Sequence, residues 1–408
     1  MAGQFQPVLV KYVKDSCIVV EGKINTDRFF IIQAGKVRIV REVDQFMKQD
    51  NSSAAGPGDI IGAVSAMAGY SYIETAVALT DVSMLVVERK YYEDLIRSNT
   101  PVAVKIIRQF SQRLRILDEM LSRRANGKIA VSDASHLLQV ADYYLNRRMF
   151  NQAFYAWQQY TVLCPGAADL AEVKQDMMKI APKVKMLKPV YPPGTMERSY
   201  PKACIVFAEG EKGEDLFIIR KGSVKISKIV NNQEVVLAVL KKGDIFGEMA
   251  LLEDKPRAAT AEVLEDCTLM AVNRANFRDL INSHPELVSR LTTLMAERIW
   301  LMYKQLANSF IENPLGRIYD ALLIQLEKDR VPLNTNQPHL CNFGLNELAG
   351  MAGLSPDEGS ALFKKIFLSK RITVSNDKIY VGDPSEVLRQ TEYYRRAMRI
   401  GNVRGDLG

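Results

Sequence analysis

The sequence predicts an α+β protein in which a small strand-rich unit occurs twice and a different, helical unit follows it. Residues 29–39, Phe-Phe-Ile-Ile-Gln-Ala-Gly-Lys-Val-Arg-Ile, are similar to residues 216–226, Leu-Phe-Ile-Ile-Arg-Lys-Gly-Ser-Val-Lys-Ile. Residues 62–86 also align with residues 247–271 without a gap. Both copies contain short alternating apolar runs separated by glycine, which is typical of strands joined by turns. Each copy is followed by a long segment with helical apolar periodicity.

The composition is that of a globular protein and excludes several classes. With 47% hydrophobic and 25% charged residues over 408 positions, the chain can form two or three domains. No apolar run approaches about eighteen residues and no signal peptide is present, so we expect a cytoplasmic protein without a membrane partner. The cysteines are widely spaced and form no CxxC or Cys/His cluster, so we expect neither a disulfide framework nor a metal site. They are Cys17, Cys164, Cys204, Cys267 and Cys341.

The helices expected after the two copies cover about 91–123 and about 276–311. Between the copies, residues 130–185 have a helical pattern of another kind. The spacing of one tetratricopeptide-type repeat is matched by Ala141, Tyr144, Ala153, Trp157 and Pro165. A single repeat cannot bury the core of a solenoid, so a helical hairpin that acts as a spacer is favoured over a peptide-binding surface.

The segments Phe246–Leu252 and Pro256–Thr260 carry the chemistry of a phosphate site. Within fifteen positions they offer one carboxylate, one guanidinium and several small residues. A singly charged phosphate needs a guanidinium fork and free backbone amides, and a ribose 2′-hydroxyl needs a carboxylate acceptor. The segments resemble the phosphate-binding cassette of the cyclic-nucleotide-binding domain, found in the catabolite activator protein (Crp) family and in the regulatory subunit of protein kinase A. The resemblance implies that each copy is a β-roll with flanking helices.

This resemblance implies a ligand role for each residue of the cassette. Glu248 would accept from the ribose hydroxyl, and Arg257 would pair with the exocyclic phosphate oxygen. Ala258 stands where cGMP-dependent kinases have threonine, so the allosteric ligand is expected to be cAMP rather than cGMP. The alternative is a structural Glu–Arg pair in a roll that binds nothing. The remaining ligand-binding residues implied are Gly247, Met249, Ala250, Ala259 and Thr260.

The nucleotide base also needs a cover. The Crp family uses two hydroxyl residues of its long helix, and the ungapped register puts Met302 and Tyr303 at those positions. This departs from the family pattern. Trp300 or Tyr303 could instead stack on the base, as an aromatic lid does in the kinase family. The alternative is that both rings belong to a core or to a dimer seam.

The first copy lacks the cassette chemistry. Ala63 corresponds to Glu248, and Tyr72 corresponds to Arg257. Glu74 would repel a phosphate from the position that Ala259 holds in the second copy. We therefore expect no cyclic nucleotide there and favour a scaffold or dimerisation role, with a different ligand as the alternative.

The last hundred residues resemble the winged helix-turn-helix of the Crp family. Residues 345–355 resemble its first helix and turn, residues 356–367 its second helix, and residues 371–374 with 378–381 its wing. The predicted domains are 1–125, a degenerate cyclic-nucleotide-binding-like domain; 126–195, a helical hairpin and linker; 196–311, a cyclic-nucleotide-binding domain with its long helix; and 312–408, a winged helix-turn-helix with a basic tail.

The charge of this last unit is weak for a DNA-binding domain. Residues 311–408 hold thirteen Lys/Arg and twelve Asp/Glu. Asp357 and Glu358 suit the helix dipole but would repel DNA phosphates. The candidate DNA-binding residues are Ser355, Ser360, Lys364, Lys365, Lys370 and Arg371.

The sequence therefore predicts a cytoplasmic cAMP sensor of the Crp type that controls transcription and self-associates as a homodimer. The alternative is a cAMP-controlled adaptor in which the helix-turn-helix does not bind DNA and a protein partner replaces it. A third reading is a regulatory subunit that inhibits an enzyme in trans, but no pseudosubstrate segment supports it. No nucleophile–base pair or metal set is present, so we do not expect an enzyme.

Overall fold

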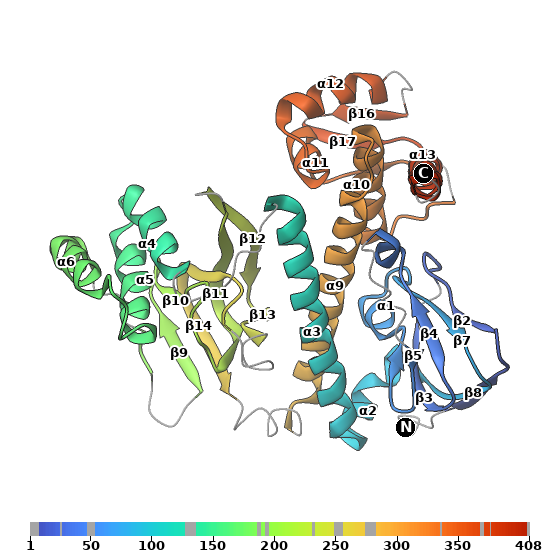
Figure 1. Cartoon of the computed structure of the whole chain (residues 1–408), viewed down its shortest axis with the longest axis horizontal. Coiled ribbons are helices and arrows are strands. Elements are labelled where there is room, and N and C mark those ends of the chain that lie inside the picture. Colours follow the sequence, from blue (N-terminus) through green and yellow to red (C-terminus); the bar gives the residue numbers. More distant parts are fainter. Residues whose placement is uncertain are drawn as a thin grey trace. The chain divides into compact units, whose positions relative to one another are not determined.

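The structure is a computed structural model that divides into two compact units (Figure 1). It describes residues 8–24, 27–46, 54–126, 136–185, 189–191, 196–230, 233–248, 256–273, 283–334, 337–367, 371–375 and 377–405. Unit 1 comprises residues 1–92, 116–127 and 295–408, and unit 2 comprises residues 93–115 and 128–294. All strand pairs among the described residues are antiparallel, and the predicted α+β class is confirmed. The predicted domain boundaries stay predictions.

Unit 1 contains the first roll, residues 8–88. Its strands are β1 (Val8–Tyr12), β2 (Cys17–Val19), β3 (Arg28–Ala34), β4 (Val37–Val40), β5 (Ala54–Ala55), β6 (Ile60–Ile61), β7 (Thr75–Ala78) and β8 (Val82–Glu88), with helix α1 (Ala63–Ala68) before β7. They form two four-stranded sheets, in the orders β1-β8-β3-β6 and β2-β7-β4-β5. Alternate side chains such as Phe30, Ile32 and Val37 point inward and are buried in one core.

Unit 2 contains the second roll, residues 197–273. Its strands are β9 (Glu197–Tyr200), β10 (Ile205–Phe207), β11 (Asp215–Val230), β12 (Gln233–Lys241), β13 (Ile245–Phe246) and β14 (Thr260–Asn273). The sheet order is β10-β14-β11-β12, and β13 and β9 pair with β11 and β14. The register repeats that of the first roll, because Phe217 faces Phe246 as Phe30 faces Ile61. The strand pairing therefore preserves the duplication seen in the sequence.

Three helices of unit 2 pack beside the second roll. They are α4 (His136–Asn146), α5 (Phe150–Leu163) and α6 (Leu170–Ile180). The small side chains of Ala141 and Ala153 are fully buried where α4 meets α5, and Trp157 is buried beside them. This cluster extends to Ala208 of the second roll, so the hairpin and the roll share one apolar core.

The helix expected over 91–123 is divided into α2 (Tyr92–Ser98) and α3 (Thr100–Asn126), which corrects that prediction. Pro101 explains the break, because proline is accepted in a first helical turn but not inside a continuous helix. The helix after the second roll is α9 (Pro285–Ser309). Residues 285–294 of α9 belong to unit 2 and residues 295–309 belong to unit 1.

The C-terminal part of unit 1 has its own core. Its elements are α10 (Pro314–Lys328), β15 (His339–Leu340), α11 (Leu345–Met351), α12 (Pro356–Phe367), β16 (Ile372–Ser375), β17 (Lys378–Val381) and α13 (Pro384–Gly405). The strands form a sheet in the order β15-β17-β16. A Cβ atom at Gly359 would lie 2.7 Å from the Ala349 methyl, so α11 and α12 cross closely only because this residue is glycine.

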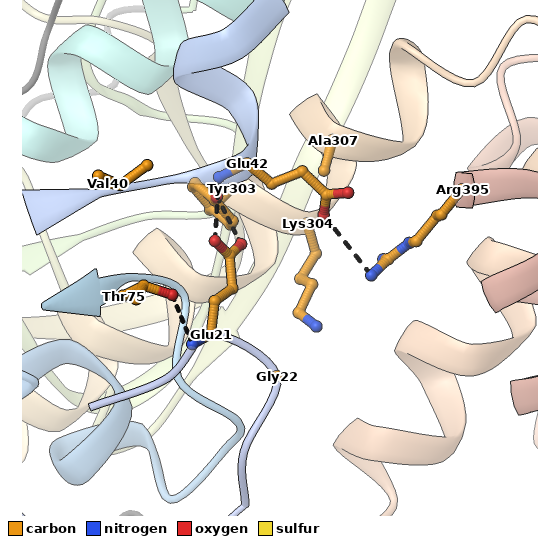
Figure 2. A pocket seen from close by; sticks show the side chains of 9 residues that line it. All are labelled: Glu21, Gly22, Val40, Glu42, Thr75, Tyr303, Lys304, Ala307 and Arg395. Carbon is orange, nitrogen blue, oxygen red and sulfur yellow. Dashed lines mark hydrogen bonds and ion pairs between the residues drawn. The ribbon is translucent and has the colours of Figure 1, made fainter. Parts of the chain in front are cut away.

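The part of α9 in unit 1 packs against the first roll. The Trp300 indole Nε1 donates to the Ser71 carbonyl at 3.0 Å, and the Tyr303 hydroxyl donates to Glu21 at 2.7 Å. Figure 2 shows the Glu21 carboxylate directed toward Tyr303, with Lys304 and Arg395 lining the same pocket. Both rings are almost completely buried, so this contact fixes the face that α9 presents to the first roll.

Replacing Glu21 by Gln should change how stability depends on pH. Burial, and then the nearby charge of Glu42, raises the pKa of the Glu21 carboxyl from 4.5 to about 7. Between these values the folded chain holds a proton that the unfolded chain releases, so stability falls as pH rises through this window. The Glu21→Gln variant lacks this loss and should gain about 1–3 kcal/mol relative to wild type between pH 5 and pH 8. Melting temperatures at the two pH values measure the effect.

The exposed Glu93→Gln substitution is the matched control and should leave the pH dependence of the melting temperature unchanged. A difference between Glu21→Gln and wild type that stays constant from pH 5 to pH 8 would contradict the prediction.

Candidate functional site

Arg257 lies in a loop that the backbone holds in place just before β14. Its amide donates to the Glu211 carbonyl at 2.8 Å, and its own carbonyl accepts from the Gly210 amide at 2.9 Å. These two bonds attach the Arg257 loop to the turn after β10. The side chain therefore starts from a fixed position inside the second roll, where it is only 4% exposed.

The Arg257 guanidinium rests on an aromatic surface. Its central carbon lies 4.0 Å from the centroid of the Phe207 ring, and Phe217 and Phe246 stack around the same ring. A cation over an aromatic face is attracted by the negative face of the ring. Phe207 and Phe217 were not among the predicted site residues, although both are inward-facing residues of strands beside the cassette.

Two glycines make room for the guanidinium. A Cβ atom at Gly213 would overlap the Arg257 guanidinium, and one at Gly247 would lie 2.7 Å from its Nη1 atom. Gly247 also has a φ of +79°, which favours glycine over other residues. Its carbonyl accepts a 2.7 Å hydrogen bond from Arg257 Nη1. The predicted role of Gly247 rested on the cassette, whereas Gly213 has no sequence signal apart from being glycine.

The charge of Arg257 is incompletely compensated. Burial lowers the pKa of the guanidinium, and the carboxylates of Glu211, Asp215 and Glu248 oppose this shift. Burial also raises the pKa of Glu211 to about 7, although hydrogen bonds from the Ala208 amide and the Tyr155 hydroxyl lower it. Glu211 therefore carries only part of a negative charge near neutral pH, which leaves Arg257 able to attract an anion.

Arg257 also has an unused donor. Its Nε atom is buried and has no hydrogen-bond partner among the described residues. An unsatisfied buried donor costs about 1–3 kcal/mol, and more when the group is charged. The arrangement can therefore hold an anionic ligand whose oxygen would satisfy this donor.

The other predicted cassette residues differ in their burial and in their hydrogen bonds. Glu248 and Ala259 are buried and Ala258 is half-buried. The Thr260 hydroxyl accepts from the Glu209 amide at 3.0 Å, which gives this residue a structural role within the roll. Met249 and Ala250 lie outside the described residues, so their predicted contacts stay predictions.

Trp300 and Tyr303, which were predicted as a possible cover of the base, are almost completely buried within unit 1. Both rings belong to unit 1, and each has a hydrogen-bond partner on the first roll. The alternative reading, in which they belong to a core, describes their position. The physical reason is that Ser71 and Glu21 offer acceptors to the two polar atoms of these otherwise apolar rings.

In the first roll, Tyr72 and Glu74 fill the positions of the cassette. The Tyr72 ring lies next to Gly62, where a Cβ atom would be 2.9 Å from its Cε1 atom. The Glu74 carboxylate accepts from the Gly62 amide at 2.9 Å and pairs with Arg41 at 3.3 Å. The Gly62 amide, which aligns with the Gly247 amide of the second roll, is therefore already hydrogen-bonded to a carboxylate.

Some of the candidate DNA-binding residues are hydrogen-bonded or paired within the protein, whereas others are exposed. Ser355 caps α12, because its hydroxyl oxygen accepts from the Glu358 amide at 3.4 Å and its own amide donates to the Glu358 carboxylate at 2.9 Å. Arg371 pairs with Glu386 at 2.6 Å. Three residues on α12 are exposed: Ser360, Lys364 and Lys365. Lys370 lies outside the described residues.

The described ranges contain neither a membrane-spanning helix nor a cluster of metal ligands. None of the helices in these ranges is both long enough and apolar enough to span a bilayer. No group of three or more His, Cys, Asp or Glu side chains in the described part of the chain could hold a metal ion.

Comparison with known proteins places both rolls in one family. The family model described as "Cyclic nucleotide-binding domain" matches residues 9–99 and 197–284. The chain is 33% identical over 159 residues to the "Cyclic AMP receptor protein" of Thermus thermophilus, a match that covers 39% of this chain and 70% of that protein. It is 30% identical over 145 residues to the "CRP-like cAMP-activated global transcriptional regulator" of Mycobacterium tuberculosis, covering 35% of this chain and 61% of that protein.

The chain is also similar to the solved catabolite activator protein of Thermus thermophilus. The sequence identity is 26%, and the match covers 48% of this chain and 90% of that chain with a TM-score of 0.28. The family model matches twice, and the match to the Thermus receptor extends over more than two thirds of that protein. This chain therefore belongs to the family of proteins built on the cyclic nucleotide-binding domain.

Proposed function

We propose that this protein is a cyclic-nucleotide sensor that binds cAMP in its second roll. The observation that carries the proposal is the buried Arg257 guanidinium, which lies over Phe207 with its Nε atom unpartnered among the described residues. Arg257 would bind the exocyclic phosphate oxygen, and Glu248 would accept from the ribose 2′-hydroxyl. Backbone amides would complete the phosphate site. They belong to Glu248, Met249, Ala250, Ala258 and Ala259, while Gly247 opens the short helix of the cassette.

The preference for cAMP over cGMP rests on Ala258. Alanine offers no hydroxyl to a guanine base, and this residue is half-buried beside Arg257. Two relatives are named as a cyclic AMP receptor and as a cAMP-activated regulator, which supports the same choice. In the first roll, Tyr72 replaces the arginine and Glu74 bonds a cassette amide, so one cyclic nucleotide per chain is proposed.

The output that we favour is control of transcription in the cytoplasm by a homodimer. The exposed side of α12 carries Ser360, Lys364 and Lys365, and the M. tuberculosis relative is named as a transcriptional regulator. Helix α9 continues from unit 2 into unit 1, so a nucleotide bound at the second roll could act on the C-terminal part by shifting the population of α9 conformations. The sensor would then be an allosteric regulator without catalysis of its own.

A cAMP-controlled adaptor is the second candidate function. The pairing of Arg371 with Glu386 and the exposed acid at Asp357 reduce the positive charge available to DNA on this side of the C-terminal part. A protein partner would then replace DNA as the target of the C-terminal part.

Replacing Arg257 by Ala should abolish nucleotide binding. The loss of a charge-assisted phosphate hydrogen bond in a buried site costs about 2–4 kcal/mol, which weakens binding roughly 30- to 1000-fold. Calorimetric titration of cAMP into the whole protein should give one site per chain in wild type and no measurable site in Arg257→Ala. The exposed Arg220→Ala in the same roll is the control and should bind as wild type does. Two sites per chain in wild type would contradict the assignment of the first roll.

Replacing Ala258 by Thr should shift the preference toward cGMP. The added hydroxyl can form one hydrogen bond with the guanine base, worth about 0.5–1.5 kcal/mol, so the ratio of cGMP to cAMP affinity should rise roughly two- to tenfold. Competition between the two nucleotides measures this ratio, and Ala258→Val controls for side-chain size. An equal rise in Ala258→Val would show that the hydroxyl is not the cause.

DNA binding should depend on cAMP, on salt and on the exposed lysines of α12. Lys364→Gln with Lys365→Gln should weaken the binding of genomic fragments and reduce its salt dependence, because a protein that neutralises fewer phosphates releases fewer counterions. A gel shift at several salt concentrations measures both effects. Failure of cAMP-bound wild type to shift any fragment at low salt would favour the adaptor.

A further inference from the structure

The first roll retains a cavity at the position of the missing cassette. The cavity has a volume of about 860 Å³, within the range of small-molecule sites. Its lining includes the apolar and aromatic side chains of Tyr12, Ile18, Phe30 and Tyr72. Tyr72 aligns with Arg257 of the second roll, so this cavity is the counterpart of the proposed nucleotide site but has an apolar wall in place of the buried guanidinium.

Two arginines from outside the strands line the same cavity. Arg89 follows β8, and Arg330 lies in the turn after α10. A Cβ atom at Gly69 would be 2.7 Å from Arg89 Nη1 and 3.3 Å from Arg330 Nη2. The two Nη atoms therefore lie within about 6 Å of each other, and an anion between them would offset the repulsion of their charges.

Charged groups of the protein itself also lie in or next to this cavity, because Asp27 and Arg28 line it and Asp329 directly precedes Arg330. In the described ranges, neither the Arg89 nor the Arg330 guanidinium forms an ion pair or a hydrogen bond. The two aspartates contact other side chains, since Asp27 pairs with Arg28 at 3.2 Å and Asp329 lies 2.9 Å from His339. Arg330 also has a φ of +55°, a left-handed conformation in which glycine is more common than arginine.

We propose that this cavity binds an amphipathic organic carboxylate. The carboxylate would lie between Arg89 and Arg330, whose planar forks match its two oxygens. The apolar body would contact Phe30 and the tyrosine rings. Since Arg330 belongs to the C-terminal part of unit 1, the ligand would join that part to the first roll. The protein would then respond to a second effector that is chemically unlike a nucleotide.

Titration calorimetry on the full-length protein tests the proposal with decanoate and 4-phenylbutyrate as probes. Decanol and inorganic phosphate are the comparison compounds, one without the charge and the other without the apolar body. At least one acid should bind at one site per chain. Arg330→Gly and Arg89→Gln should each weaken that binding at least tenfold. Arg330→Gly suits the left-handed backbone, so its melting temperature should not fall, and a loss of binding would not reflect misfolding.

Two further variants separate this site from its surroundings and from the nucleotide site. Lys90→Gln removes an exposed cation next to Arg89 that does not line the cavity, and it should bind the acid as wild type does. Arg257→Ala should also bind the acid normally. The proposal is overturned if neither acid binds, if decanol or phosphate binds as tightly, if the arginine variants bind unchanged, or if Arg257→Ala abolishes acid binding.

Discussion

Each roll depends on one glutamate, half-buried in the first roll and buried in the second, that joins neighbouring segments of the backbone. In the first roll, the Glu21 amide donates to the Thr75 hydroxyl at 3.0 Å, and the Glu21 carboxylate accepts from the Glu42 amide at 2.9 Å. The second roll repeats these bonds with Glu209, Thr260 and Ile229, at 3.0 and 3.4 Å. A carboxylate in such a place is costly unless its remaining acceptor positions are satisfied. Each roll therefore needs a further donor from another element.

In each roll a side chain from a different helix approaches this glutamate. Tyr303 of α9 donates to Glu21, whereas His136 of α4 lies 3.3 Å from Glu209. The hydrogen bond and charge of Glu209 raise the pKa of His136 although burial opposes this, so the pair favours the charged imidazolium. The same glutamate position thus selects α9 as the cover of the first roll and the helical hairpin as the cover of the second.

Local patterns in the sequence predicted the duplicated rolls and the cassette, because strand alternation and positive-φ glycines such as Gly247 depend on near neighbours. The partner of a buried ring depends on tertiary contacts instead. Helical periodicity marked Trp300 as apolar but could not show that its indole would bond to Ser71. Gly213 was missed for the same reason, since the guanidinium that it accommodates belongs to a residue over forty positions away.

The two rolls differ because Tyr72 of the first roll stands where the second roll has the buried cation Arg257. In the second roll, Arg257 carries a desolvated charge that Phe207 and three carboxylates compensate only in part. In the first roll, Tyr72 fills that position, and its hydroxyl donates to the Arg28 carbonyl at 3.2 Å. The interior of the first roll no longer needs an anion, so the positive charge near its cavity can come from more solvated arginines at the edge. A duplicated fold can thereby keep its backbone hydrogen bonds while the charged and apolar groups in its two cavities come to differ.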